Sequence, residues 1–431
     1  WSSSKVSSCT ASGDWSGTKG TSGSESVTPT SAGEKSYTLS CSGSNGTASA
    51  SVNVKVNTPP GPTLLWSKFY NPAGATRSGL RSVVIGANNE IAAGGFKLAN
   101  NIVGFGIGYR SSGDLLFVVD NLGQTPSNFN SAAKHPTEDR FFFAGDIRSG
   151  EFTSVFLASI NNLGGVSESE CQEIANRAIF ATAIARDNTS LYIGTSSADG
   201  QKVITATLDG VLDCRSGFAV RSGSADHITD ITVAENHFWV TGHFTGNSGA
   251  KATYLRKFDR AGNPLGDETV LQNVGNPRIV EAAEGAESFV YLSGTLFGEA
   301  ASEQGSVNQS FLLLKLDQNG REAWRREWKG DNASNKQANF AYDLAPRLGG
   351  GVVQCGAITK LAAADANSTE VGAVAYNPSG EAVFKIRHQF GTNSDVALSC
   401  IVDSAGDLIL TGTAYRTNAD GDSFVAKFRL P

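Results

Sequence analysis

Residues 395–430 decide the fold: DVALSCIVDSAGDLILTG, a short polar segment, and then DSFVAKFRL near the end of the chain. Two apolar runs flank an Ala405-Gly406-Asp407 turn, and a third run follows the polar segment. This order predicts a strand, a tight turn, a second strand, a loop and a third strand.

The last unit lacks a fourth strand. Elsewhere the third run continues through a glycine turn into a segment with a tryptophan, as in residues 310–328 (SFLLLKLDQNGREAWRREW). The segment of this kind that no other unit uses is residues 64–70 (LLWSKFY), at the opposite end of the repeat region. We therefore expect residues 64–70 to complete the last unit and to close a ring.

A glycine that ends the second apolar run recurs about every 50 residues, a period typical of propeller blades. These glycines are Gly95, Gly145, Gly194, Gly242, Gly294, Gly356 and Gly412. Four strands per unit at this period predict a β-propeller, and seven such glycines predict seven blades.

Several third runs end in Lys and Asp before a glycine turn, as at Lys257 and Asp259, at Lys315 and Asp317, and in part at Lys427. In these features the sequence resembles the seven-bladed propellers of secreted bacterial repeat proteins. The resemblance covers residues 64–431. It implies the fold and an extracellular setting, but no activity, because the family has none in common.

Residues 1–57 have a different texture, rich in Ser, Thr and Gly with short alternating runs. The runs around Cys9, Trp15 and Cys41 resemble a bacterial immunoglobulin-like β-sandwich module with one internal disulfide. A full sandwich needs more strands. Either upstream residues are lacking, or another chain supplies the missing strands. Residues 58–63 form a Pro-rich linker, which favours an extended spacer.

Composition excludes several classes of function. Charged residues make up 18% of the chain, the net charge is −6, and no basic run occurs, so we expect neither nucleic acid nor an anionic membrane as partner. No apolar run approaches the ~20 residues that span a bilayer. Phosphate-loop, zinc-protease and haem motifs are lacking, so we predict no cofactor and no metal. Because the sequence starts at Trp1, we expect a processed chain.

The six cysteines contain no CxxC pair, which favours disulfides over zinc. Their positions in the predicted units suggest three bridges and an oxidising, extracellular or cell-surface location. The alternative is buried free thiols in a reducing compartment. The predicted bridges are Cys9–Cys41, Cys171–Cys214 and Cys355–Cys400.

Two groups of side chains are candidates for a ligand site. Asp226 and His227 precede one predicted inner strand and His243 ends the next, so antiparallel pairing brings the histidines together on the face that propellers use for binding. They could hold a divalent metal or do acid–base chemistry. The alternative is surface histidines bonded to loop backbone.

The second group is Asp230, Glu281 and Asp343, which we place at equivalent inner-strand positions of adjacent blades. Three carboxylates near one channel could bind a cation or raise one another's pKa. The alternative is that each caps backbone groups of its neighbouring blade.

Three classes of function follow. The first is a non-catalytic extracellular binding or adhesion protein, with a protein or glycan ligand on the propeller face. The second is a structural subunit that assembles into a filament or sheath through the incomplete immunoglobulin-like module. The third is a polysaccharide-acting enzyme. We expect the first, because no recognisable nucleophile or acid–base pair occurs beyond the two candidate groups.

Overall fold

The computed structural model describes residues 1–29, 33–56, 61–122, 127–149, 152–171, 180–197, 200–222, 227–245, 251–297, 309–331, 338–360, 368–417 and 420–431. These residues form strands β1 to β32, and none of them lies in a helix. In this part of the chain, therefore, no helix is long and apolar enough to cross a membrane. The chain divides into unit 1 (Trp1–Gly61) and unit 2 (Pro62–Leu430).

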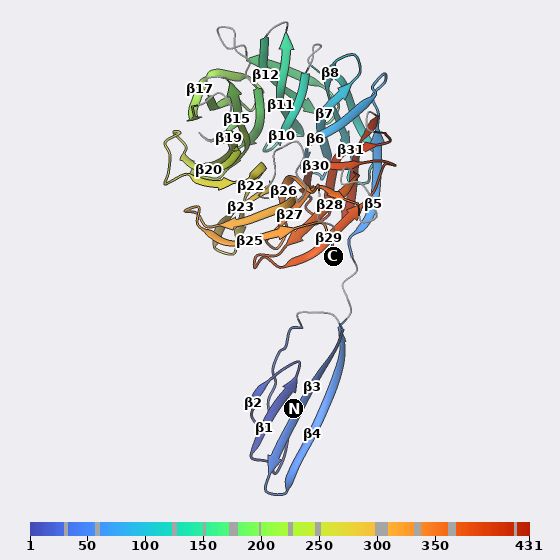
Figure 1. Cartoon of the computed structure of the whole chain (residues 1–431), viewed down its shortest axis with the longest axis vertical. Coiled ribbons are helices and arrows are strands. Elements are labelled where there is room, and N and C mark those ends of the chain that lie inside the picture. The colour runs from blue at the N-terminus through green and yellow to red at the C-terminus, as the bar shows by residue number, and fades with distance from the viewer. Residues whose placement is uncertain are drawn as a thin grey trace. The chain divides into compact units, whose positions relative to one another are not determined.

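Unit 2 is β-propeller-like: consecutive strands form four-stranded antiparallel groups (Figure 1). The first two groups are β6 (Arg77–Ile85), β7 (Ile91–Leu98), β8 (Ile102–Tyr109) and β9 (Leu115–Leu122), then β10 (Ser127–Lys134), β11 (Arg140–Ser149), β12 (Phe152–Asn161) and β13 (Val166–Cys171). The next two are β14 (Phe180–Arg186), β15 (Ser190–Ser197), β16 (Gly200–Thr207) and β17 (Leu212–Arg221), then β18 (His227–Val233), β19 (His237–Thr245), β20 (Lys251–Asp259) and β21 (Thr269–Gln272). The following two are β22 (Val274–Glu284), β23 (Glu287–Leu296), β24 (Ser310–Leu316) and β25 (Glu322–Trp328), then β26 (Phe340–Pro346), β27 (Val352–Thr359), β28 (Thr369–Tyr376) and β29 (Ala382–His388).

The last group joins the two ends of unit 2. It contains β30 (Asp395–Val402), β31 (Leu408–Tyr415) and β32 (Gly421–Arg429), and β5 (Thr63–Tyr70) pairs antiparallel with β32 as its fourth strand. Gly421 also pairs with Arg77, which links this group to β6. The first and last strands of unit 2 thus lie in one sheet, where residues 64–70 were expected.

Trp66 of β5 makes the same contact between sheets as Trp324 of β25. The Trp66 indole donates to the Ser111 carbonyl at 3.1 Å, and the Trp324 indole donates to the Pro378 carbonyl at 3.0 Å. A lysine from the third strand of each group reaches the same turn of the next group. Lys427 Nζ lies 2.9 Å from Ser111 Oγ, and Lys315 Nζ lies 3.0 Å from the Pro378 carbonyl. The Lys and Trp positions of the repeat therefore connect each of these sheets to the next one.

The first strand of each four-stranded group of unit 2 is interrupted by a β-bulge. The register shifts lie between Leu80 and Ser82, Phe129 and Ser131, Ala181 and Ala183, Ile228 and Asp230, Gly275 and Arg278, Ala341 and Asp343, and Ala397 and Ser399. A bulge turns the extra residue out of the ladder and bends the strand.

The repeating glycines face these bulges. Gly412 pairs with Ala397, the residue just before the bulge of β30. A Cβ atom added to Gly412 would overlap the carbonyl oxygen of Val396, and the same overlap with an inner-strand carbonyl would occur at four others. These four are Gly95, Gly145, Gly242 and Gly356. The glycine of the sequence repeat is therefore required by the close approach of two backbones.

Two of the three predicted disulfides are present. Cys9–Cys41 joins β1 to β3, and Cys171–Cys214 joins β13 to β17, the outer strands of adjacent sheets. The predicted bridge Cys355–Cys400 is not formed, since both residues are free, buried thiols.

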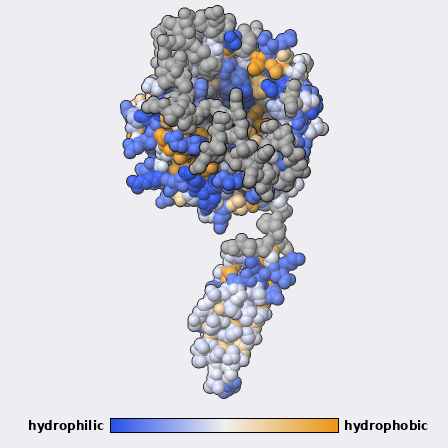
Figure 2. Space-filling model, viewed as in Figure 1, coloured by the Kyte–Doolittle hydropathy of each residue, from blue (hydrophilic) through white to orange (hydrophobic). Residues whose placement is uncertain are grey.

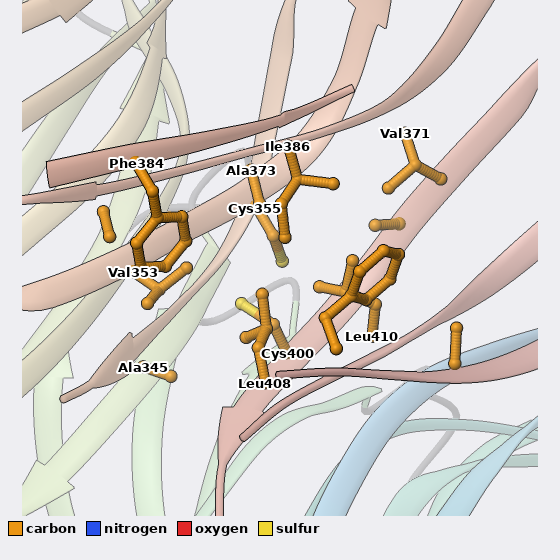
Figure 3. Packing of buried hydrophobic residues seen from close by; sticks show 14 of the residues in the cluster. Ala345, Val353, Cys355, Val371, Ala373, Phe384, Ile386, Cys400, Leu408 and Leu410 are labelled. Atoms are coloured by element: carbon orange, nitrogen blue, oxygen red, sulfur yellow. The ribbon is translucent and has the colours of Figure 1, made fainter. Parts of the chain in front are cut away.

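Figure 3 shows the sulfur atoms of Cys355 and Cys400 pointing toward each other inside an apolar cluster between β27 and β30. In such surroundings a thiol packs as a small hydrophobic side chain. Burial raises the pKa of both thiols, which disfavours the thiolate that disulfide formation requires.

Unit 1 is one antiparallel sheet in the order β2-β1-β3-β4. Its strands are β1 (Ser8–Gly13), β2 (Gly17–Lys19), β3 (Gly33–Gly43) and β4 (Gly46–Val56). The rings of Trp1, Trp15 and Tyr37 pack edge to face, with centroids 5.6 Å and 6.2 Å apart. Strand β4 is exposed along almost its whole length. Figure 2 shows mostly pale, weakly polar surface on this unit, with a few hydrophobic residues among it.

We predict that Gly412→Ala destabilises unit 2 by about 2 kcal/mol or more, because the strands must separate to admit the methyl group. The matched control is Gly61→Ala, where an added Cβ meets no atom within 4 Å. Thermal unfolding of the two variants checks this. Equal melting temperatures would show that the glycine does not limit strand approach.

Candidate functional site

The first strands of the groups in unit 2 surround a cavity of about 530 Å³, here called the axial pocket. Residues from β6, β10, β14, β18, β22, β26 and β30 all contribute to its lining, so it lies where these strands converge. Figure 1 shows β6, β10, β22, β26 and β30 nearest the middle of unit 2. The lining residues are Arg77, Arg81, Phe96, Asn130, Thr182, His227, Ile228, Thr229, His243, Arg278, Tyr342, Val396, Leu398, Thr413 and Tyr415.

The bulges supply much of this lining. Where a bulge contains one extra residue, that residue lines the axial pocket. These residues are Arg81, Asn130, Thr182, Thr229, Tyr342 and Leu398. In β22 the bulge is longer, and Arg278 directly after it lines the pocket. The same irregularity that requires the repeating glycines therefore turns side chains toward the axis.

His227 and His243 lie side by side on one wall of the axial pocket. They are directly paired residues of β18 and β19, and their ring centroids are 5.1 Å apart. Imidazole is the side chain that most readily exchanges a proton near neutral pH. Asp226, the third member of the predicted group, lies outside the described residues. Among the described residues, no cluster of His, Cys, Asp or Glu could hold a metal ion.

Three arginines give the axial pocket a positive lining. The Arg81 guanidinium donates to Asn130 Oδ1 at 2.9 Å and lies 4.7 Å from the centre of the Phe96 ring. Arg77 lies over the same ring at 5.8 Å, and its buried Nε has no hydrogen-bond partner. Burial lowers the pKa of Arg81, and the like charge of Arg77 adds to this.

Arg278 comes from the opposite side of the ring. Its Nε donates to the Tyr342 carbonyl at 3.1 Å, and its Nη1 donates to the Thr229 carbonyl. It thereby ties β22 to both neighbouring inner strands. Burial raises the pKa of Asp230 and Asp343, and the positive charge of Arg278 opposes part of this rise.

Asp230 and Asp343 line a smaller cavity of about 180 Å³ that adjoins the axial pocket and shares Arg81 and Arg278 with it. Desolvation by burial raises the pKa of Asp230 to about 6 and also raises that of Asp343. Both residues are half-buried and keep some accessible surface.

Each of these two carboxylates fastens its own strand to the next sheet. Asp230 accepts from its neighbour Ile231 N at 2.9 Å and from Ile279 N of β22 at 2.9 Å. Asp343 accepts from Leu344 N at 2.8 Å, and from Ser399 Oγ and Cys400 N of β30 at 2.6 Å and 2.9 Å. These contacts agree with the second interpretation given above, in which each carboxylate caps backbone groups of the neighbouring blade.

The predicted equivalence of Glu281 with Asp230 and Asp343 is wrong. The longer bulge of β22 shifts the register, so Arg278 occupies the position after the bulge that the two aspartates occupy elsewhere. Glu281 pairs with Val290 further along the strand. There it lies 3.0 Å from His237 Nε2 and accepts from Gln318 Nε2 at 2.9 Å, away from the axial pocket.

Sequence reasoning missed the arginines and the two tyrosines of the axial pocket. A bulge shifts the alternation of side chains along a strand by one residue. Strict alternation ignores this shift, so it assigns Arg81 and Tyr342 to the wrong face of the inner strand. One signal was present: Arg81 is a lone charge within an apolar run, GLRSVVI.

No family model and no curated protein matches this chain. Solved structures resemble it at low identity. The arabinanase Arb43A of Bacillus subtilis is 14% identical, with 60% of this chain and 100% of that chain covered and a TM-score of 0.35. A protein of unknown function from Dyadobacter fermentans is 8% identical, with 86% and 100% covered and a TM-score of 0.48. The α-L-arabinofuranosidase PaAbf62A of Podospora anserina is 8% identical, with 57% and 93% covered and a TM-score of 0.33.

The prediction of a non-catalytic binding or adhesion protein is corrected by this comparison. Two of the similar structures are carbohydrate-acting enzymes by name, the class of the alternative prediction of a polysaccharide-acting enzyme. At identities from 8% to 14% the likeness concerns the fold. The case for that alternative therefore depends on the axial pocket itself.

The pKa of Asp230 predicts a pH dependence of stability. The folded protein keeps on Asp230 a proton that the unfolded chain releases above its ordinary pKa of 3.8, so this contribution to stability is lost as the pH rises from about 4 to about 6. Asp230→Asn cannot titrate, but it gives up one of the two backbone contacts. We expect its deficit in melting temperature, relative to the natural chain, to be largest at pH 4 and to shrink by pH 6 or 7. A deficit that stays constant or grows would contradict the raised pKa.

Proposed function

We propose that unit 2 is a seven-bladed β-propeller and that its axial pocket is the active site of a polysaccharide-acting enzyme. One observation carries the proposal: the bulged inner strands and the second strands beside them bring two imidazoles, two phenols and three guanidinium groups into one cavity. Perturbed and chemically active side chains that converge in a pocket are the usual mark of a functional site.

The size of the axial pocket fits this proposal. Its volume of about 530 Å³ lies within the range of small-molecule sites, which run from about 300 to 1,000 Å³. Hydroxyl and amide groups of Asn130, Thr182 and Thr413 are interspersed with Phe96 and Leu398. The polar side chains can form hydrogen bonds with the hydroxyl groups of a sugar, and the apolar side chains can pack against the faces of its ring.

The disulfides support an extracellular site of action. The disulfides Cys9–Cys41 and Cys171–Cys214 are of a kind that persists in oxidising compartments, as in secreted proteins. We propose that the protein is secreted or displayed at the bacterial cell surface, with unit 1 as an immunoglobulin-like module. The enzyme then meets its polymer outside the cell.

For unit 1 we propose self-association with a second copy of the chain. A groove of about 1,040 Å³ runs over its sheet, lined by Trp15, Tyr37 and Val52 among others. Val52 is 57% exposed and Val54 43% exposed on the edge strand β4. Two copies of β4 can pair antiparallel around a two-fold axis, which satisfies the open backbone edge and brings these valines together.

The enzyme proposal predicts that the intact protein releases reducing ends from at least one polymer in a panel of neutral and acidic polysaccharides. His227→Gln should lower this rate by about 10²- to 10⁴-fold, the usual effect of removing a general acid or base. His237→Gln is the matched control, because His237 lies on β19 at the end opposite to His243. The absence of cleavage of every polymer, or equal loss in both variants, would refute the assignment.

The self-association proposal predicts a dimer mass for the intact chain in solution. Val52→Lys should return the mass to that of a monomer, because it sets a charge against its own copy across the pair. A monomer at all concentrations before any substitution would exclude this contact.

A further inference from the structure

We infer that the substrate of the axial pocket is an acidic polysaccharide built from uronic acids, and that the pocket cleaves it by β-elimination rather than by hydrolysis. The inference rests on the proposed function and adds the substrate class and the reaction. Two independent features of the axial pocket lead to it: a lining with three arginines, and the engagement of Asp230 and Asp343, the carboxylates of the adjoining cavity.

The charge is the first feature. Arg77, Arg81 and Arg278 line the axial pocket, while no Asp or Glu is among its described lining residues. Arg77 and Arg81 both lie over the ring of Phe96, and the buried Nε of Arg77 has no hydrogen-bond partner. Two like charges held this close repel each other unless an anion lies between them.

Nearby protein anions offset this charge only in part. Burial lowers the pKa of Arg81 more than the attraction of Asp146 raises it. Asn130 lies between the two groups: its Nδ2 donates to Asp146 Oδ1 at 3.0 Å while its Oδ1 accepts from Arg81. Burial raises the pKa of Asp146, which weakens its value as a counter-ion. Planar guanidinium groups bind carboxylates through paired hydrogen bonds. The carboxylate of a uronic acid can form such hydrogen bonds with Arg77 and Arg81.

The carboxylates are the second feature. Glycoside hydrolysis generally requires two carboxyl groups, one as acid and one as base or nucleophile. The carboxylates nearest the axial pocket, Asp230 and Asp343, instead accept backbone N–H groups through both of their oxygens. Turning either of them toward a sugar would release the adjacent sheet. Among the described residues that line the axial pocket, imidazole and phenol remain for proton transfer.

Elimination needs only such groups. A base takes the proton from C5, next to the uronate carboxylate, and the electron pair is delocalised into the carboxylate as an enolate. The pair then forms the C4=C5 double bond as the C4–O4 bond breaks, and the leaving oxygen receives a proton from an acid. No water, oxidant or reductant enters the reaction, so atoms and electrons balance. The arginine pair stabilises the negative charge that develops on the carboxylate as the proton departs.

The side chains divide between these roles. An imidazole of the His227–His243 pair acts as the base, because a neutral imidazole nitrogen can accept a proton. Tyr342 suits the acid, since burial raises its pKa to about 12 and its hydroxyl stays protonated. Arg77 and Arg81 hold the carboxylate. Arg278, bonded to two inner strands, gives the opposite wall its charge.

The test uses the intact protein with polygalacturonate and alginate as acidic polymers and arabinan as a neutral one. Ultraviolet absorbance detects the conjugated double bond, mass spectrometry detects products lighter by one water than hydrolysis products, and a reducing-end assay counts all cleavage. We expect unsaturated products from an acidic polymer only. Arg81→Gln should lower that rate by about 10- to 100-fold. Arg325→Gln, on the exposed face of β25, is the matched control and should leave it unchanged.

The outcomes separate the two proposals. Reducing ends without a double bond, from any polymer, overturn the elimination but keep the polysaccharide-acting enzyme. Cleavage of arabinan alone overturns the acidic substrate. No cleavage of any polymer refutes both. If Arg81→Gln lowers the melting temperature, inhibition of the natural protein by free galacturonate, and not by galactose, provides the second measurement. Equal inhibition by both sugars would overturn the role of the arginines.

Discussion

In five of the seven groups of unit 2, the backbone of the inner strand approaches the backbone of the second strand so closely at one point that only glycine fits there. Gly412 lies against the Val396 carbonyl, and Gly242 lies in the same way against the His227 carbonyl. Directly after this contact each of these five inner strands bulges. The close approach and the bulge occur together around the ring. They fix where the sheets bend and which side chains turn toward the axis.

The ring depends on polar links between neighbouring sheets as well as on apolar packing. Near the axis, Asp230 and Asp343 bind backbone N–H groups of the following inner strand. Near the rim, Lys315 and Lys427 reach the turn of the following sheet. The Lys427 ammonium is also paired with Asp403 at 2.8 Å, and both are almost fully buried. Buried polar groups satisfied in this way fix a single arrangement of the sheets.

Much of the architecture could be predicted from the sequence, because glycine, turn and tryptophan positions recur with the repeat. Strand β5 was located from its Trp66 alone, and that tryptophan makes the contact that Trp324 makes elsewhere. The bulges could not be predicted, because one extra residue leaves the apolar run intact while reversing which side chains face inward. This explains why Glu281 was aligned wrongly and why Arg81 and Tyr342 were overlooked. The thiols Cys355 and Cys400 were placed together correctly, but spacing does not tell a buried thiol pair from a bridge.

The axial pocket is thus formed by the same local geometry that shapes the sheets. Glycine permits the close approach of two strands, the inner strand bulges beside it, and the bulged residue lines the pocket. Three arginines give the axial pocket positive charge. The carboxylates of the adjoining cavity, Asp230 and Asp343, bind backbone groups of the next sheet. The most direct measurement is a crystal structure of the intact protein with an unreacted oligouronate bound to the His227→Gln variant. We predict the saccharide in the axial pocket with a carboxylate on Arg77 and Arg81. A saccharide bound elsewhere on unit 2, with the axial pocket free of it, would contradict the account.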